Sequence, residues 1–287
     1  ATISDNAGTA INASNLSAIG AKTSGAVTVT NAIAISGTTA EVTAALVTTD
    51  SLVVAGSATV TISDAITIAQ LTAIDAKTSG TNTYTTISDT ASNLATNTGS
   101  YVTGSVDVTI TDGITAAELV TINALTSGDI TLNDTNDTLT DSTADLVSAF
   151  TGTVTAYTGA ITINDANSTA LNATDLSDIG GETSGVVTVS NAVVISGTQA
   201  AVTAALVTTA TLVVAATATA TISDANSTAI TATNLSAIGA KTSGAVTVSN
   251  AVVISGTQAE VTAALVTTAS LVVAATATAT ISDANST

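Results

Sequence analysis

Residues 221–244 read Thr221-Ile-Ser-Asp-Ala-Asn-Ser-Thr-Ala-Ile-Thr-Ala-Thr-Asn-Leu-Ser-Ala-Ile-Gly-Ala-Lys-Thr-Ser-Gly244, and close relatives of this stretch recur along the 287-residue chain. The stretch begins with the phrase Thr-Ile-Ser-Asp, which recurs along the chain at similar intervals. One further copy of this phrase, at Thr86, does not fit these intervals. Such self-similarity indicates a repeat protein, in which each unit buries its apolar face against its neighbours. The phrase Thr-Ile-Ser-Asp or a close variant begins, at similar intervals, at Thr2, Thr61, Thr109, Thr162, Thr221 and Thr280.

The whole chain, 1–287, is therefore interpreted as one continuous repeat array. Because it contains no Met and begins and ends within the repeat, we expect it to be a stretch of a longer array. The blocks are 2–60, 61–108, 109–161, 162–220 and 221–279, followed by the start of a sixth at 280–287.

Each block combines strand patterns with short helical patterns. Residues 245–249 and 276–281 place small or apolar side chains on one face and mainly Thr on the other, with the period of a β-strand. Helical patches show apolar pairs such as Leu119 with Ile122. Capping boxes of the form Ser/Thr-x-x-Glu/Gln predict where helices begin: Thr38 with Glu41, Thr67 with Gln70, Thr115 with Glu118, and Thr257 with Glu260.

A Thr-Ser-Gly tripeptide follows most helical patches. We expect its glycine to end the helix in the left-handed conformation that glycine adopts readily. The positions concerned are Gly25, Gly80, Gly128, Gly185 and Gly244.

These patterns predict a parallel β-solenoid with short helical turns, and the alternative is an α/β solenoid of leucine-rich-repeat character. Because the phrase recurs in one local context, its isoleucines are expected to stack in one interior column. They are Ile3, Ile62, Ile110, Ile163, Ile222 and Ile281.

Composition excludes several classes of function. The chain has three basic residues, all Lys, and 21 Asp and Glu, so its formal net charge is −18. It contains no His and no Cys. Without imidazoles or thiolates we expect no Ser–His or Cys–His chemistry, no transition-metal cofactor and no enzymatic site. The charge disfavours nucleic acid as a partner. The uninterrupted apolar runs are too short to span a membrane.

The carboxylates suggest two roles. The Asp of the repeated phrase is predicted to form a turn by accepting hydrogen bonds from nearby amides. The acidic stretch 133–145 is a candidate Ca²⁺ site through Asp134, Asp137, Asp141 and Asp145, although it lacks the glycine and terminal Glu of an EF-hand. We interpret Glu41, Glu118 and Glu260 as helix caps, because the position equivalent to Glu260 in the preceding block holds Ala201. We interpret Lys22, Lys77 and Lys241 as solvated surface, because the position equivalent to Lys241 holds Glu182, which has the opposite charge.

The segments Ile87-Ser-Asp-Thr-Ala-Ser-Asn-Leu94 and Ile254-Ser-Gly-Thr-Gln-Ala-Glu-Val-Thr-Ala-Ala-Leu265 resemble Thr/Ala-rich repeats of very large secreted bacterial cell-surface proteins, especially those of cyanobacteria. The resemblance covers nearly the whole chain. It implies an extracellular or cell-surface repeat protein that is exported without disulfides. Such proteins often carry calcium-binding repeats elsewhere in the same polypeptide.

The sequence thus favours a structural building block of an extracellular fibre, sheath or surface layer. Its coils would stack lengthwise, and copies would associate with one another end to end. The alternative is a binding role, either as the stalk of an adhesin or through Thr ladders that bind ice or glycans.

Overall fold

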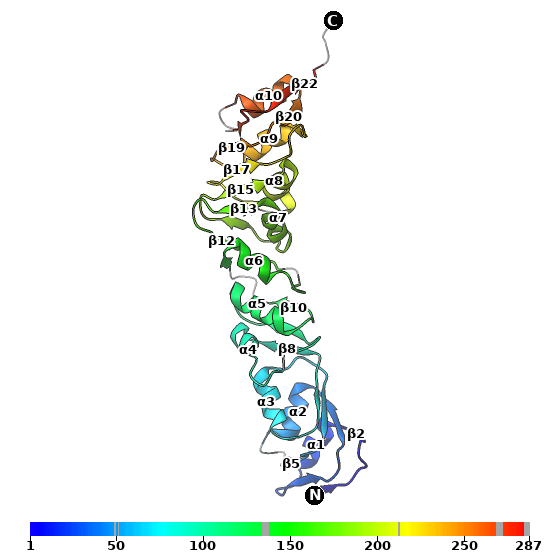
Figure 1. Cartoon of the computed structure of the whole chain (residues 1–287). Helices are drawn as coiled ribbons and strands as arrows, with labels where there is room; N and C mark the ends of the chain where they lie inside the picture. Colours follow the sequence, from blue (N-terminus) through cyan, green and yellow to red (C-terminus); the bar gives the residue numbers. More distant parts are fainter. Residues whose placement is uncertain are drawn as a thin grey trace. The chain divides into compact units, whose positions relative to one another are not determined.

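The computed structural model describes residues 1–48, 50, 52–133, 138–155, 157–211, 213–267 and 272–283 (Figure 1). They belong to two compact units. Unit 1 comprises Ala1–Ile114, Thr121–Asp134 and Gly152–Thr155, and unit 2 comprises Thr115–Val120, Thr135–Thr151 and Ala156–Thr287. The division lies mainly in block 109–161, one of the two blocks whose sequence departs from the other three.

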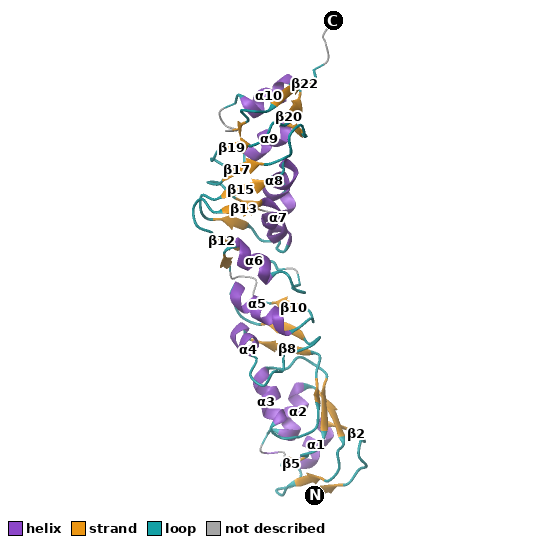
Figure 2. Ribbon diagram, viewed as in Figure 1, coloured by secondary structure: helices purple, strands orange, loops and turns teal. Residues whose placement is uncertain are grey.

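Unit 1 alternates short strands with short helices (Figure 2). Its helices are α1 (Ala13–Gly20), α2 (Thr39–Leu46), α3 (Ile68–Asp75) and α4 (Ala91–Thr96), and α5 (Ala116–Leu125) contributes residues to both units. Its strands are β1 (Thr2–Ile3), β2 (Ala10–Asn12), β3 (Val27–Val29), β4 (Ala34–Gly37), β5 (Val53–Val54), β6 (Thr59–Ile62), β7 (Asn82–Thr83), β8 (Thr86–Asp89), β9 (Asp107–Ile110) and β10 (Ile130–Leu132).

Unit 2 repeats the same alternation. Its helices are α6 (Thr143–Ala149), α7 (Ala173–Gly181), α8 (Gln199–Leu206), α9 (Ala232–Gly239) and α10 (Gln258–Leu265), with a 3-10 turn at Thr209–Thr211. Its strands are β11 (Leu139–Asp141), β12 (Ile161–Ile163), β13 (Ala170–Asn172), β14 (Val187–Val189), β15 (Val194–Gly197), β16 (Val213–Val214), β17 (Thr219–Ile222), β18 (Ala229–Thr231), β19 (Val246–Val248), β20 (Val253–Gly256), β21 (Val272–Val273) and β22 (Thr278–Ile281).

The paired strands described are parallel and join chain segments about one repeat unit apart. Thr86 lies opposite Asp107, for example, and Thr2 lies opposite Thr28. The parallel strands and short helices predicted from the sequence are thereby confirmed as a repeat-like α/β arrangement; a closed solenoid path stays a prediction. The strand orders are β1-β3-β5, β2-β4-β6-β7 and β10-β9-β8 in unit 1, and β11-β12-β14-β16, β13-β15-β17-β19-β21 and β18-β20-β22 in unit 2.

The core is aliphatic. In β19, Val246 and Val248 are buried while Thr247 between them is exposed, as strand periodicity predicts. The predicted helical pair Leu119 and Ile122 is also fully buried. Because each helix is only a few turns long, its stability comes from this packing rather than from its own hydrogen bonds. Helices pack most closely in successive pairs: α1 with α2, α7 with α8, and α9 with α10.

The predicted single column of isoleucines is wrong. Ile62, Ile110, Ile163 and Ile222 are buried, but Ile281 is 49% exposed. They also lie in different sheets, where their register partners are other residues: Val29 opposite Ile3, Gly37 opposite Ile62, Val189 opposite Ile163 and Val248 opposite Ile222. The reason is that successive strands alternate between two sheets and block 162–220 holds five of them, β12 to β16, so the next copy of the phrase begins on the other sheet.

Aromatic side chains fill the diverged middle of the chain. In unit 2 the rings of Phe150 and Tyr157 are both buried, with centroids 6.3 Å apart. In unit 1 the Tyr84 hydroxyl donates to the carbonyl oxygen of Tyr101 at 2.9 Å. Burial raises the pKa of Tyr84 above its ordinary value, and Tyr101 and Asp75 add to the rise.

Candidate functional site

The most elaborate polar arrangement in the structure lies at the junctions between successive repeat units. There the aspartate of a Thr-Ile-Ser-Asp phrase accepts a hydrogen bond from the first backbone N–H of the helix in the preceding unit. We call this contact the aspartate clamp. The donor and acceptor pairs, with their distances, are Thr39 to Asp64 (2.6 Å), Ile68 to Asp89 (2.9 Å), Ala91 to Asp112 (2.7 Å), Thr143 to Asp165 (2.7 Å), Gln199 to Asp224 (2.6 Å) and Gln258 to Asp283 (2.5 Å).

The clamp corrects the predicted role of this aspartate. The helix amide that it binds belongs to another repeat unit, as Thr39 does for Asp64 and Gln199 for Asp224. A helix N-terminus leaves its first N–H groups without intrahelical partners and carries partial positive charge, so a carboxylate from the neighbouring unit suits it. In two clamps the side chain of the first helical residue joins in, because the hydroxyls of Thr39 and Thr143 also donate to the clamping carboxylate.

The copy of the phrase at Thr86 belongs to this system although its spacing is irregular. Asp89 is 7% exposed, and its carboxylate accepts from the Ile68 and Thr90 N–H groups and the Asn93 side-chain amide. Three donors therefore satisfy a buried carboxylate without a cation. Sequence spacing could have revealed the clamp, since an aspartate follows the N-cap threonine at a similar separation here (Thr67 to Asp89) and elsewhere (Thr38 to Asp64).

The Thr-Ser-Gly tripeptide forms a second contact between units, which we call the saddle. Thr242 donates its hydroxyl to the Ala218 carbonyl, and Ser243 donates both its N–H (2.8 Å) and its hydroxyl (2.9 Å) to the Ala216 carbonyl. Thr78 and Ser79 contact Ala58 and Gly56 in the same way.

The saddle also corrects the predicted role of its glycine. None of the five glycines has a positive φ; the glycines that do, among the described residues, are Gly8, Gly99 and Gly104. Instead, a Cβ atom at Gly80 or Gly244 would collide with the carbonyl oxygen of Ala58 or Ala218 in the preceding unit. Glycine is needed because the neighbouring backbone approaches closely. At Gly25 the space is open, and the closest atom is the hydroxyl oxygen of Thr23 at 3.8 Å.

The predicted capping boxes are confirmed. In α10 the Thr257 hydroxyl accepts from the Glu260 N–H at 3.3 Å, and the Glu260 carboxylate accepts from the Thr257 N–H at 2.8 Å. The latter bond, together with those from the hydroxyls of Thr233 and Thr257, lowers the pKa of Glu260 below its ordinary value. The other boxes are Thr38 with Glu41, Thr67 with Gln70, and Thr115 with Glu118.

The candidate calcium site is described only in part. Asp134 and Asp137 lie outside the described residues. Asp141 accepts from the Ser142 N–H at 2.8 Å, and Asp145 accepts from the Ser142 hydroxyl at 2.6 Å, so both carboxylates serve the start of α6. Within the part of the chain that the structure describes, no group of three or more His, Cys, Asp or Glu side chains is placed to hold a metal ion. A calcium site in 133–145 stays a prediction.

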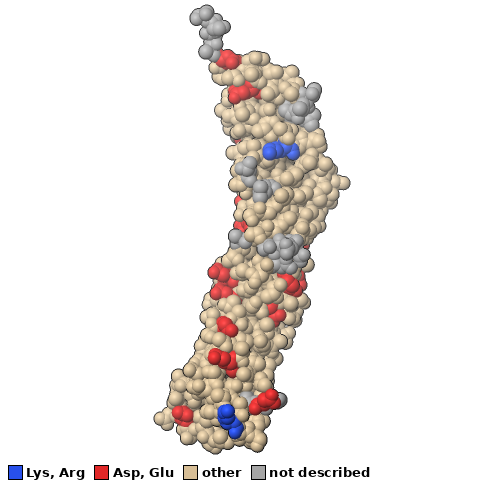
Figure 3. Space-filling view, turned by 180° about the vertical axis from the view of Figure 1, so that it is seen from behind, with Lys and Arg blue, Asp and Glu red and all other residues tan. Residues whose placement is uncertain are grey.

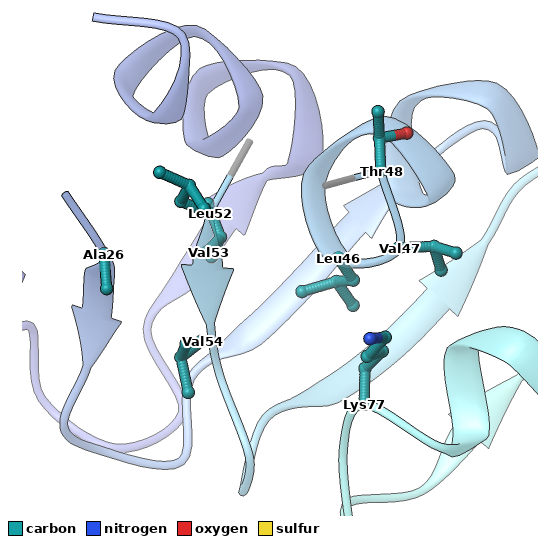
Figure 4. Close-up of a pocket in the computed structure, with 8 residues that line it drawn as sticks. All are labelled: Ala26, Leu46, Val47, Thr48, Leu52, Val53, Val54 and Lys77. Atoms are coloured by element: carbon teal, nitrogen blue, oxygen red, sulfur yellow. The ribbon is translucent and has the colours of Figure 1, made fainter. Parts of the chain in front are cut away.

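Charged side chains are sparse on the face drawn in Figure 3. Lys22, Lys77 and Lys241 are exposed, in agreement with a solvated position. Lys77 borders a shallow pocket of about 250 Å³ in unit 1, which is otherwise lined by apolar side chains and Thr48 (Figure 4). Leu46, Val47 and Val54 form much of its wall. One ammonium group beside aliphatic side chains provides neither a nucleophile nor an acid–base pair.

Comparisons with protein-family models, curated proteins and solved structures give no match for this chain. Among the described helices, none combines the length and apolar character needed to cross a lipid bilayer.

Proposed function

We propose that the chain is a non-enzymatic structural component of an extracellular fibre, sheath or surface layer. Its repeat units follow a solenoid path and stack lengthwise, so that the array provides length and stiffness. The observation that carries this proposal is the recurrence of the aspartate clamp and the saddle from one unit to the next. The cell-surface location rests on the resemblance to repeats of secreted bacterial surface proteins.

The junction chemistry supports a structural role. The carboxylates of the clamps and the hydroxyls of the saddles are engaged by backbone groups of the neighbouring unit, as in Asp224 with Gln199 and Thr242 with Ala218. Polar groups satisfied in this way hold units together and are not free for substrate. Repeat proteins gain their stability from such contacts between neighbours.

A binding role through Thr ladders is the alternative. In unit 2, Thr140, Thr162 and Thr188 are consecutive register partners on β11, β12 and β14. The next position in the row is Val214, which is 49% exposed. The row of threonines therefore ends at Thr188, and this short length favours the structural role over an extended ice- or glycan-binding face.

The test is to lengthen the array. Inserting a second copy of residues 221–279 after Ala279 adds five strands divided between two sheets, which at the usual spacing of parallel strands should extend the particle by about 12 Å at constant width. Small-angle X-ray scattering of the original and lengthened chains measures both dimensions. An increase in cross-section without an increase in length would contradict lengthwise stacking.

A further inference from the structure

Strand β5 forms a free sheet edge in the interior of the sequence. It pairs with β3 and is the last strand of the order β1-β3-β5. The cause is an extra strand: between α2 and α3 the chain holds β5, β6 and the bridge residue Ile66, whereas between α1 and α2 it holds only β3 and β4. The next turn of the chain therefore pairs with β6 through β7, and the described residues add no strand to the other side of β5.

The direction of the backbone groups on this edge follows from one hydrogen bond. The Leu52 carbonyl faces β3, because it accepts from the Val27 N–H at 2.9 Å. The Val53 N–H belongs to the same planar trans peptide and so points away from β3. In the extended strand the Val53 carbonyl points to the same side as its N–H. Val53 thus presents one donor and one acceptor at the free edge, which are the two groups that an antiparallel partner strand requires.

The side chains beside this edge are aliphatic. The pocket of about 250 Å³ described above lies here, and Figure 4 shows Val47 and Lys77 on the side of β5 that faces away from Ala26, the residue before β3. Val54 is 54% exposed and Leu52 is 38% exposed, and both line this pocket. A strand edge with exposed aliphatic side chains is a site where a strand of another chain can pair.

The edge carries opposite charges at its two ends. Lys77 lies near the end of β5, because the next two residues, Thr78 and Ser79, form the saddle on the turn that follows this strand. Asp50 precedes the start of β5 and is exposed. Among the described residues, neither Lys77 nor Asp50 has an ion-pair partner. Because an antiparallel partner reverses the order of the two ends, each charge would meet the opposite charge of an identical edge.

We infer that β5 pairs antiparallel with β5 of a second copy of this chain, around a two-fold axis at Val53. The two Val53 residues exchange two N–H···O=C hydrogen bonds, and Leu52 and Val54 of each copy pack against those of the other. In this register Asp50 lies opposite the partner's Gly56, on the turn that the partner's saddle covers, and so lies beside the partner's Lys77. Two symmetric ion pairs flank the apolar contact. This inference rests on the proposed function and specifies its self-association.

A second edge of the same kind shows why β5 selects itself. In unit 2, β16 is the last strand of its sheet and Val214 is 49% exposed. Lys241 precedes the saddle on the turn after β16, as Lys77 does after β5. The position of Asp50, however, holds Ala210. Two β5 edges therefore form two ion pairs, a β5 edge with a β16 edge forms one, and two β16 edges form none.

The experiment measures dimerisation of the 287-residue chain by sedimentation velocity in 0.15 M NaCl, where a Debye length of about 8 Å screens distant charges more than charges in contact. The wild type should form dimers whose fraction rises with concentration. Lys77→Asp or Asp50→Lys should weaken dimerisation about tenfold or more, because two attractive contacts become repulsive. The double variant Lys77→Asp/Asp50→Lys reverses both signs and should dimerise within about threefold of the wild type.

The matched control is Lys241→Asp, which has the same net charge as Lys77→Asp but faces no aspartate at the equivalent place. It should dimerise like the wild type. Carbodiimide cross-linking, which joins a lysine to a carboxylate in contact with it, provides an independent measurement. Because the chain has only three lysines, peptide mapping can identify the link, and the cross-linked dimer should contain Lys77 joined to Asp50.

Three outcomes would overturn the inference: a wild type that stays monomeric, equal effects of Lys77→Asp and Lys241→Asp, or a double variant that dimerises no better than the single ones. Cross-links spread evenly over the three lysines would also overturn it. Failure here leaves the lengthening experiment unaffected, because that experiment measures stacking within one chain.

Discussion

The saddle glycines allow one repeat unit to pack closely against the next because they have no Cβ atom. Gly80→Ala should destabilise unit 1 by about 1–3 kcal/mol, because the added Cβ collides with the Ala58 carbonyl and a backbone must move. Urea unfolding followed by circular dichroism measures the change. The matched control is Gly25→Ala, where the atom nearest to the new methyl group is the Thr23 hydroxyl oxygen at an ordinary contact distance of 3.8 Å, and stability should stay within about 0.5 kcal/mol of wild type.

The aspartate clamp has a similarly matched pair of positions. Asp224→Ala removes the acceptor of the Gln199 N–H and should cost about 1–2 kcal/mol, as the loss of a helix cap does. Asp5 is the equivalent residue in the first block, and no donor to its carboxylate is present among the described residues. Asp5→Ala should therefore change the urea midpoint little. Equal effects of the two substitutions would mean that the clamp does not stabilise the helix.

Residue-scale prediction from the sequence succeeded for contacts within one helix and failed for contacts between units. The capping box of Thr257 and Glu260 is complete in one short segment, so its pattern can be read directly. Asp224 and Gln199 lie in different repeat units, and nothing local in either segment specifies the other. The saddle glycine was recognised as special, but the cause lies in the Ala218 carbonyl of another unit rather than in its own φ.

The helices are elements whose ends are fixed by several acceptors at once. In α10 the first turn is held by the Thr257 hydroxyl, the Glu260 carboxylate and the clamp from Asp283. The described helices begin at uneven intervals: α3 and α4 start at Ile68 and Ala91, whereas the wider-spaced α8 and α9 start at Gln199 and Ala232. Because caps rather than length define these short helices, the capping boxes predicted well where the helices begin. The sheet to which each strand belongs depends on the length of the connecting turns, and the sequence did not predict it.

The capping carboxylate of α10 gives a pH dependence with a definite sign. The Thr257 N–H, helped by the hydroxyls of Thr233 and Thr257, lowers the pKa of Glu260 from its ordinary 4.5. A carboxyl with a lowered folded-state pKa stabilises the fold above its unfolded-state pKa, and this contribution is lost as the pH falls through the folded-state value. Glu260→Gln keeps an acceptor for the box but does not titrate.

Thermal unfolding of wild type and Glu260→Gln should therefore be compared between pH 7 and pH 3. The wild type should be the more stable protein at pH 7, and the difference should disappear toward pH 3. A difference that stays constant over this range would show that ionisation of Glu260 does not contribute. Glu118→Gln, which alters the equivalent box with Thr115 in unit 2, provides a comparison at a second helix.

At the scale of the whole molecule, the proposed fibre, sheath or layer combines stacking of units within one chain with association of separate copies. Internal junctions form within one covalent chain, so loop closure brings their two sides together at little entropic cost. Junctions between copies must overcome the loss of translational freedom and the mutual repulsion of chains that each carry a formal charge of −18. Association of copies should accordingly be weaker than stacking of units and should depend on the solution conditions.

The dependence on salt follows from screening. The Debye length falls from about 10 Å at 0.1 M to about 3 Å at 1 M ionic strength, so the repulsion between acidic chains weakens while the hydrogen bonds and apolar contacts of the junction change much less. Light scattering across an NaCl series should show the average mass rising with ionic strength. A CaCl₂ series at matched ionic strength should raise it more steeply if residues 133–145 bind Ca²⁺, and MgCl₂ provides the control for divalent screening alone. A chain that stays monomeric at high concentration and high salt would contradict association of copies, and the stacked array would then function as a segment of one covalent stalk.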